Sequence, residues 1–231
     1  MSRAEIKKEA KKLLVGNHLT ILIMMILVTV IAYAAGNIST TILFSAINAT
    51  PDMGANTLLG YLLIYIVVYI FMLAFVMSLG LGLIKTYTKV VKEEDISITD
   101  VFSMVKHMGK AFCMNFVVSL YTTLWSLLFI IPGIIKTYSY AATPYIIANN
   151  PDMKINDAIT KSRELMDGHK FELFVLQLSF IGWMLLGILT LGIGLLYVLP
   201  YMSITLANFF VKIGVIDGNT NPIKTEGEVV E

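Results

Sequence analysis

The sequence predicts an all-α, polytopic membrane protein with six transmembrane helices arranged as three hairpins. Three observations predict this fold. Of the 231 residues, 57% are hydrophobic and only 14% are charged, whereas a soluble globular chain carries about 25% charged residues. Long stretches lack any ionised side chain, and the basic residues gather between those stretches. The net charge of +1 gives no overall field that would attract nucleic acid, so no nucleic-acid partner is expected.

The stretches without charge locate the predicted spans, because a lone ionised group in hydrocarbon is costly. Residues 19–51, 53–84 and 173–211 contain no Lys, Arg, Asp or Glu, and residues 111–151 contain only Lys136. A spanning helix needs about 20 residues, and turn signals at 48–56, Pro132-Gly133 and 190–194 divide these stretches. Within a membrane domain over 19–211, the predicted spans are 19–46, 58–84, 111–131, 134–148, 172–190 and 193–211.

The basic residues orient these spans, because cytoplasmic loops carry the excess of Lys and Arg. Sixteen of the 17 lie in four segments that would share one side of the membrane. These segments are an amphipathic helix at 1–18, connections at 85–110 and 149–171, and a disordered tail at 212–231. Both termini are therefore expected in the cytoplasm, with the protein in the bacterial cell membrane. The fourth span, 134–148, is short and contains Lys136 and Pro144, so it either crosses the bilayer or is re-entrant.

A cleaved signal peptide is the alternative interpretation of the N-terminus. Lysines precede an apolar run that reaches the A-x-A pattern Ala32-Tyr33-Ala34. Apolar character continues past this point to Phe44, and the basic region has a helical pattern of its own. Both features favour a retained helix.

A short amphipathic segment that ends in glycine precedes each odd-numbered span. The glycines are Gly16, Gly109 and Gly168, and a glycine after the last turn commonly ends a helix. Ser2 and Glu5 form a capping-box pattern at the start of the first segment. The second and third hairpins also share a tryptophan followed later by Pro-Tyr, which suggests a hairpin repeat. The residues assigned structural roles are Pro132, Gly133, Gly168 and Trp183.

The segment from Ile131 to Tyr201 carries a family resemblance. Its most specific parts are Ile131-Pro-Gly-Ile-Ile-Lys-Thr-Tyr-Ser-Tyr, Ser162-Arg-Glu-Leu-Met-x-Gly168 and Leu178-Ser-Phe-Ile-Gly-Trp183. It resembles a family of bacterial integral membrane proteins known only as a domain of unknown function, nine-seven-five. The Ser-Arg-x-Leu-x-x-Gly segment is also distantly similar to the membrane domain of glycerophosphodiester phosphodiesterases. The first resemblance implies the fold and supplies no activity, and the phosphodiesterase domain has no counterpart here.

The sequence contains no motif of an enzyme, a metal site or a cofactor site. No catalytic residue, metal or cofactor is therefore expected. Lys136 is the only basic side chain within the predicted spans, and it either extends to the interface or contacts an anionic headgroup. The prolines at 144 and 200 either interrupt helices beside a site or are ordinary kinks. The candidate ligand or lipid contacts are Lys136, Tyr140, Pro144, Tyr145, Pro200 and Tyr201.

The connection at 149–171 predicts an amphipathic helix with mixed charges opposite an apolar stripe. Such a helix either docks a protein partner or lies on the membrane with its charged face in water. The candidate docking residues are Asp157, Ser162, Arg163 and Glu164, with Ser162 also placed to bond to a neighbouring span. Two functions follow. The chain either binds or moves an amphiphile such as a lipid or hydrophobic peptide without enzymatic chemistry, or serves as an accessory subunit for a protein partner.

Overall fold

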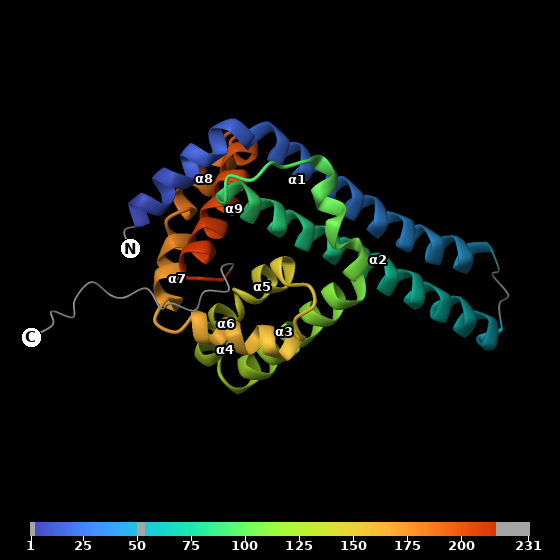
Figure 1. Cartoon of the computed structure of the whole chain (residues 1–231). Coiled ribbons are helices and arrows are strands. Elements are labelled where there is room, and N and C mark those ends of the chain that lie inside the picture. Colours follow the sequence, from blue (N-terminus) through green and yellow to red (C-terminus); the bar gives the residue numbers. More distant parts are fainter. Residues whose placement is uncertain (1–2, 50–53, 216–231) are drawn as a thin grey trace, which may run out of the picture.

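The computed structural model describes residues 3–49 and 54–215, and the regular structure in these ranges is entirely helical (Figure 1). The elements are α1 (Arg3–Ala49), α2 (Ala55–Val91), the 3-10 helix η1 (Ile98–His107), α3 (Met108–Leu128), α4 (Ile130–Tyr140), α5 (Thr143–Asn149), α6 (Ile155–Leu165), α7 (Lys170–Leu178), α8 (Ile181–Leu189) and α9 (Leu195–Lys212). This confirms the all-α prediction. Ser2 and the tail from residue 216 lie outside the described residues.

Five helical segments of the described chain are long and apolar enough to cross a membrane, judged by length and composition. They are Arg3–Ser45, Asn56–Val91, Ile98–Leu128, Lys170–Leu189 and Leu195–Lys212. These segments support a multi-pass membrane protein. The predicted span 134–148 is not among them, because its residues are divided between the end of α4 and the short helix α5.

Helix α1 continues through Gly16, where the sequence predicts its end. The reason is one buried stripe, Ile6, Ala10, Leu14 and Ile21, which keeps its helical spacing on both sides of the glycine. Burial of that stripe outweighs the cost of about 1 kcal/mol for an interior glycine. Gly109 also lies inside a helix, in the first turn of α3. Only Gly168 among the three predicted stops has a positive φ, +78°, and it follows the end of α6.

The turn between α3 and α4 lies at Phe129 rather than at Pro132-Gly133. Phe129 has extended backbone angles, φ −159° and ψ 143°, between two helical residues. Pro132 falls in the first turn of α4, where a missing N–H leaves no helical hydrogen bond unmade. Gly133 lies where α4 meets α3, because a Cβ at this position would be 2.2 Å from Ser126 Oγ. The proline and glycine therefore shape the return arm of the hairpin instead of its tip.

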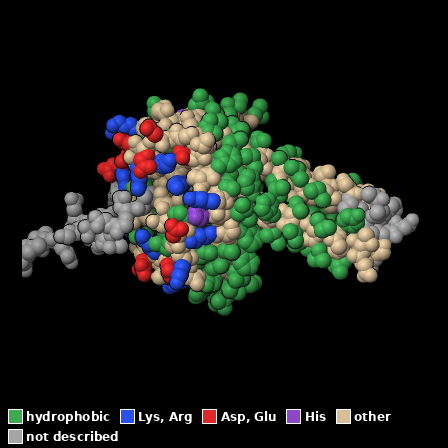
Figure 2. All heavy atoms as spheres, turned by 45° about the vertical axis from the view of Figure 1, so that its right-hand side comes forward, with side chains coloured by type: hydrophobic (Ala, Val, Ile, Leu, Met, Phe, Trp, Pro, Cys, Tyr) green, Lys and Arg blue, Asp and Glu red, His purple; other side chains and the backbone are tan. Residues whose placement is uncertain are grey.

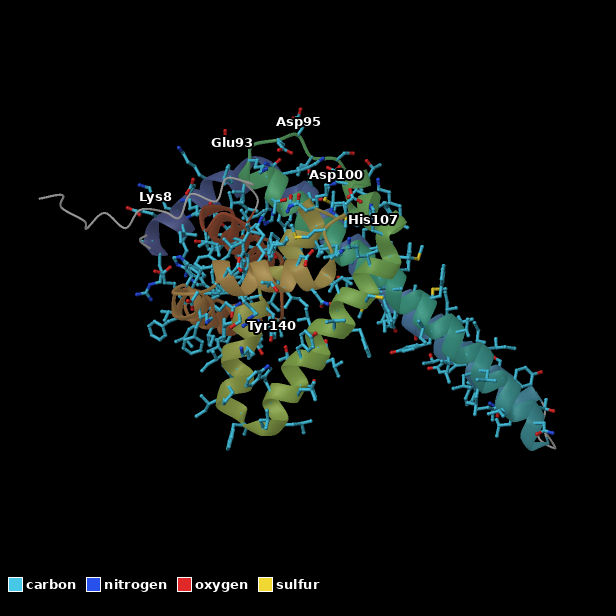
Figure 3. The ribbon with its side chains drawn as sticks, turned by 60° about the horizontal axis from the view of Figure 1, so that its bottom comes forward. Lys8, Glu93, Asp95, Asp100, His107 and Tyr140 are labelled. Carbon is cyan, nitrogen blue, oxygen red and sulfur yellow. The ribbon has the colours of Figure 1, made fainter. Side chains whose placement is uncertain are left out.

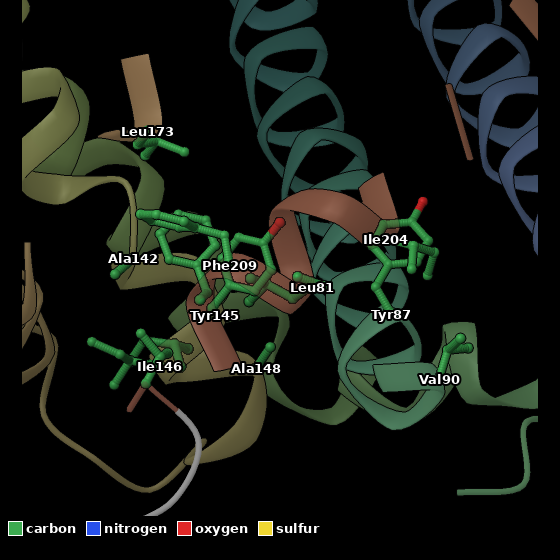
Figure 4. Packing of buried hydrophobic residues seen from close by; sticks show 14 of the residues in the cluster. Leu81, Tyr87, Val90, Ala142, Tyr145, Ile146, Ala148, Leu173, Ile204 and Phe209 are labelled. Atoms are coloured by element: carbon green, nitrogen blue, oxygen red, sulfur yellow. The ribbon is translucent and has the colours of Figure 1, made fainter. Parts of the chain in front are cut away.

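The short helix α5 lies inside the protein core. Tyr145, Ile146, Ile147 and Ala148 are all buried, and Figure 4 shows α5 residues packed with Leu81 of α2 and Phe209 of α9. Tyr145 lies against Phe210, with ring centroids 4.3 Å apart. The apolar residues of this segment are therefore covered by protein.

Helix α2 is held against η1 by a close approach of the two backbones. A Cβ on Gly82 would be 1.9 Å from the carbonyl oxygen of Val101. The 3-10 helix begins with a capping box between Ser97 and Asp100, and Asp100 also forms a 2.9 Å ion pair with Lys89 of α2. These contacts fix the connection that follows the long first hairpin.

Charged side chains gather on one face of the molecule. Figure 2 shows Lys, Arg, Asp and Glu crowded at one end, followed by a band of hydrophobic side chains, beyond which the α1–α2 hairpin extends alone. In Figure 3, Lys8, Glu93, Asp95, Asp100 and His107 lie along one side, and the α1–α2 and α3–α4 hairpins project away from it. We call this side the charged face, formed by the exposed charged residues of 3–12, 92–95 and 152–167.

Candidate functional site

A cavity of about 340 Å³ lies between α3, α4 and α6. Its lining combines two cations with hydroxyl, amide and aromatic groups: Tyr121, Trp125, Lys136, Tyr140, Asn156, Ile159, Thr160 and Arg163. Lys136, Tyr140 and Arg163 were candidates from the sequence in two separate groups. The structure brings these three residues to the lining of one cavity.

Helix α4 places Lys136 over an aromatic wall of the cavity. Its Nζ lies 4.6 Å from the centroid of the Trp125 ring, a distance at which the face of the ring attracts a cation. The close approach of Gly133 to Ser126 brings this part of α4 against α3. Tyr121 and Tyr140 pack together beside it, with ring centroids 6.3 Å apart. Lys136 is therefore held at the cavity by both arms of the hairpin.

Helix α6 places Arg163 at the same cavity. Ser162 is buried, and its hydroxyl donates a 2.9 Å hydrogen bond to the carbonyl oxygen of Ser139 on α4. Ala158 and Ile159 are also buried on this side of α6. The expected bond from Ser162 to a neighbouring helix is thus present. It fixes the rotation of α6, so that Arg163, one residue further on, lies at the cavity edge.

The charges of the cavity favour an anion. Neither Lys136 nor Arg163 forms an ion pair with a carboxylate in the described parts of the chain. Guanidinium groups bind phosphate or carboxylate through two parallel hydrogen bonds, while lysine acts as a point charge. Asn156 and Thr160 on α6 can donate further hydrogen bonds. Among the described residues the two cations therefore have no carboxylate counter-ion, and neutral donors lie beside them.

The other candidate contacts lie elsewhere. Pro144 lies in the first turn of the buried helix α5, and the Tyr145 ring packs in the core. Pro200 lies inside α9 and lines a second cavity of about 240 Å³ between α9 and α1, which is lined almost wholly by apolar side chains. The Tyr201 hydroxyl donates a 3.3 Å hydrogen bond to the carbonyl oxygen of Lys7. Tyr145 and Tyr201 thus serve packing between helices in this structure.

The candidate docking and structural residues also differ in exposure. Asp157 and Glu164 are exposed on α6, while Ser162 is buried and unable to contact a partner directly. Trp183 on α8 is 50% exposed on the apolar surface. Two other polar side chains join helices: the Asn208 amide donates a 3.2 Å hydrogen bond to the carbonyl oxygen of Ile6, and Gln177 accepts a 3.1 Å hydrogen bond from the Tyr138 hydroxyl. Asn115 instead bonds within its own helix.

Sequence reasoning did not place Tyr121, Trp125, Asn156 and Thr160 at the site. Their spacing carries a signal, because Tyr121 and Trp125 are four residues apart on one helix. Asn156, Thr160 and Arg163 follow the i, i+4, i+7 pattern of one helical face. Which two faces meet depends on the fold of the α3–α4 hairpin, and helical periodicity alone does not give that.

No group of three or more His, Cys, Asp or Glu side chains within the described ranges could hold a metal ion. Residues 127–215 match the model of a family described as a protein of unknown function (DUF975). The matched segment runs from the tip of the α3–α4 hairpin to the end of α9, and it contains Lys136 and Arg163. This segment is thus similar to the family that the sequence resembles. Neither the curated proteins nor the solved structures contain a match to this chain.

Proposed function

We infer that this protein binds an anionic amphiphile of the membrane, with its headgroup in the α3–α4–α6 cavity, and that it does so without enzymatic chemistry. The observation that carries this proposal is the placement of two cations, Lys136 and Arg163, beside the apolar surface of a membrane hairpin, with no counter-ion for either in residues 3–49 and 54–215. A phosphate or carboxylate headgroup would accept hydrogen bonds from both cations. The acyl chains of the amphiphile would lie along exposed apolar residues of α3 and α4.

The proposal includes the orientation of the chain. The charged face would lie on the cytoplasmic side of the bacterial cell membrane, because basic residues favour that side. All three hairpins, α1–α2, α3–α4 and α8–α9, would enter and leave from that face. The headgroup site would then be reached from the cytoplasmic leaflet.

Tryptophan fluorescence tests the proposal, because the chain has two tryptophans and one of them lines the cavity. In a Trp183→Phe background, all tryptophan fluorescence comes from Trp125. We expect a saturable change when short-chain phosphatidylglycerol is added to the protein in a zwitterionic detergent, and none with short-chain phosphatidylcholine. A hydrogen bond to a charged group contributes about 1.5–3 kcal/mol, so Lys136→Gln or Arg163→Gln should weaken binding about tenfold or more.

The matched control is Lys161→Gln, which removes a cation from α6 outside the cavity lining. Its affinity for phosphatidylglycerol should equal that of the background protein. Native mass spectrometry from nanodiscs of mixed lipids gives a second readout, with retained phosphatidylglycerol lost in the Lys136→Gln, Arg163→Gln double variant. Equal binding of both lipids, or unchanged binding by the double variant, would refute the proposal.

Protein docking is the second candidate function, and the exposed carboxylates of α6 favour it. Asp157 and Glu164 lie on the exposed face of this helix, away from the buried Ala158 and Ser162. Arg163 belongs to the cavity and does not separate the two functions. Asp157→Lys does: loss of a co-purifying protein with unchanged phosphatidylglycerol binding would identify docking as a separate role.

A further inference from the structure

The tip of the α3–α4 hairpin is apolar throughout. Residues 127–131 are Leu, Leu, Phe, Ile and Ile, and their exposed fractions lie between 64% and 78%. The tip contains no charged, amide or hydroxyl side chain. A patch of this kind is unfavourable in water, so the tip requires an apolar surrounding.

The cavity sets an upper limit on how far this tip reaches into the membrane. Helix α6 carries exposed Asp157 and Glu164 and therefore lies in water or at the headgroups. Because α6 and α4 line the same cavity, Lys136 lies at that boundary too. Lys136 contacts Trp125 of α3, so the level of Lys136 lies close to the tip on both arms. Six residues along α4 lead from Lys136 to Ile130, and three along α3 lead from Trp125 to Leu128. The longer distance is about 9 Å of helix, against about 30 Å of hydrocarbon.

The α8–α9 hairpin also has an apolar tip a short distance from the water boundary. Lys7, which is flanked by exposed charged residues of α1, donates a 3.3 Å hydrogen bond to the carbonyl oxygen of Ser179 and lies 4.1 Å from the centroid of the Phe180 ring. The start of α8 is therefore close to the water boundary. The nine residues of α8 extend about 14 Å beyond it. The tip exposes Leu191 at 95% and Ile193 at 72%.

The α1–α2 hairpin differs in its length beyond the charged residues and in the polarity of its tip. Beyond Lys12 its arms carry no charge through Ala49 and from Ala55 to Ile84, which corresponds to about 55 Å of helix in the first arm and about 45 Å in the second. Its described tip residues include Asn48, Asn56 and Thr57, which water can solvate. Figure 1 shows this hairpin extending beyond the rest of the molecule.

We propose that only the α1–α2 hairpin crosses the bilayer, while the α3–α4 and α8–α9 hairpins are re-entrant and end among the acyl chains of the leaflet next to the charged face. The protein body is then embedded in one leaflet, and Figure 3 shows the α1–α2 and α3–α4 hairpins leaving that body on the side away from the labelled charged residues. This arrangement replaces six full crossings with two and places the headgroup cavity at the surface of the occupied leaflet. It does not depend on whether a lipid binds there.

Single cysteines test this arrangement in a Cys113→Ala background, because Cys113 is the only native cysteine. The full-length chain is reconstituted into vesicles, oriented, and treated with a membrane-impermeant maleimide from each side. Asp157→Cys and Asn48→Cys serve as markers of the two sides. We expect these markers to react from opposite sides and Phe129→Cys and Leu191→Cys to react from neither. Leu128→Cys is the substitute at the same tip if Phe129→Cys folds poorly.

A nitroxide at each tip cysteine then identifies its surrounding. We expect collisions with oxygen, which dissolves in acyl chains, and protection from a water-soluble nickel complex. Labelling of residue 129 or 191 from the far side would show a full crossing and overturn the proposal. Labelling from the side of Asp157 would place the tip in water and also overturn it. Shielding from both oxygen and nickel would place protein over the tip, which contradicts acyl chains as the occupant.

Discussion

The α1–α2 and α3–α4 hairpins leave the same body but differ in length and in the chemistry of their tips. The arms of the first have 47 and 37 residues, and those of the second have 21 and 11. The first tip carries amide and hydroxyl side chains near Asn48 and Thr57, while the second is wholly apolar. Yet both come from long stretches almost free of charge. Arm length and tip polarity therefore indicate the depth of a hairpin better than hydropathy does.

The close backbone contacts of the two hairpins also differ. On the first, Gly82 brings α2 against the backbone of η1, where no side chain can move aside. On the second, Gly133 brings α4 against Ser126 of α3, whose hydroxyl is the nearest atom. The first contact joins the hairpin to the body, and the second joins its own two arms.

The largest effect is expected from Gly82→Ala. The new Cβ would lie 1.9 Å from the carbonyl oxygen of Val101, so α2 and η1 must separate. Overpacking costs typically 1–3 kcal/mol, and we expect about 3 kcal/mol here because both partners are backbone. Thermal unfolding in nanodiscs measures this loss.

The matched control is Gly80→Ala, two residues away on the same helix, where a Cβ meets nothing within 4 Å. It should keep or raise the unfolding temperature, since alanine favours a helix by about 1 kcal/mol over glycine. Equal unfolding temperatures for the two variants would show that the approach of α2 to η1 does not hold the first hairpin to the body.

A charge placed at each tip compares the two hairpins directly. In an acyl-chain surrounding, Phe129→Asp should cost about 2.5–3.5 kcal/mol. Since residue 129 is the N-cap of α4, an aspartate there recovers about 1 kcal/mol, leaving a net loss of about 2 kcal/mol. Asn48→Asp, at a tip in water, should change stability by less than about 0.5 kcal/mol. Unfolding in nanodiscs measures both, and similar losses at the two tips would remove the proposed difference in depth.

The all-helical fold, the membrane character and the charged segments follow from composition and charge placement, because these properties need no knowledge of packing. The division of residues 134–148 between α4 and the buried helix α5 does not follow from composition or charge placement. An apolar stretch results equally from contact with lipid and from burial in protein, and Ile146 and Ile147 are fully buried in a core cluster that several helices form. Similarly, Gly16 resembles a helix stop until the stripe from Ile6 to Ile21 is seen to pack continuously.

The candidate site was predictable only in parts. Lys136 stands out as the single cation in a long apolar stretch, and Arg163 lies in the segment that carries the family resemblance. Their meeting at one cavity depends on the turn at Phe129 and on the rotation of α6, which long-range contacts determine. The hydrogen bond from Ser162 to Ser139 is such a contact. Through this bond the α3–α4 hairpin positions α6 and therefore Arg163.

The smallest effect is expected from Ser162→Ala, which removes that bond and leaves a buried carbonyl with one partner fewer. The cost should be about 1–2 kcal/mol in unfolding free energy. Because the bond fixes α6 against α4, Arg163 should also move from the cavity, and phosphatidylglycerol binding should weaken several-fold in the Trp125 fluorescence assay. Ser119→Ala, which removes an exposed hydroxyl on α3, should change neither quantity. Loss of stability with unchanged lipid affinity would show that α6 keeps its position without this bond, and that the apolar contacts of Ala158 and Ile159 suffice to hold Arg163 at the cavity.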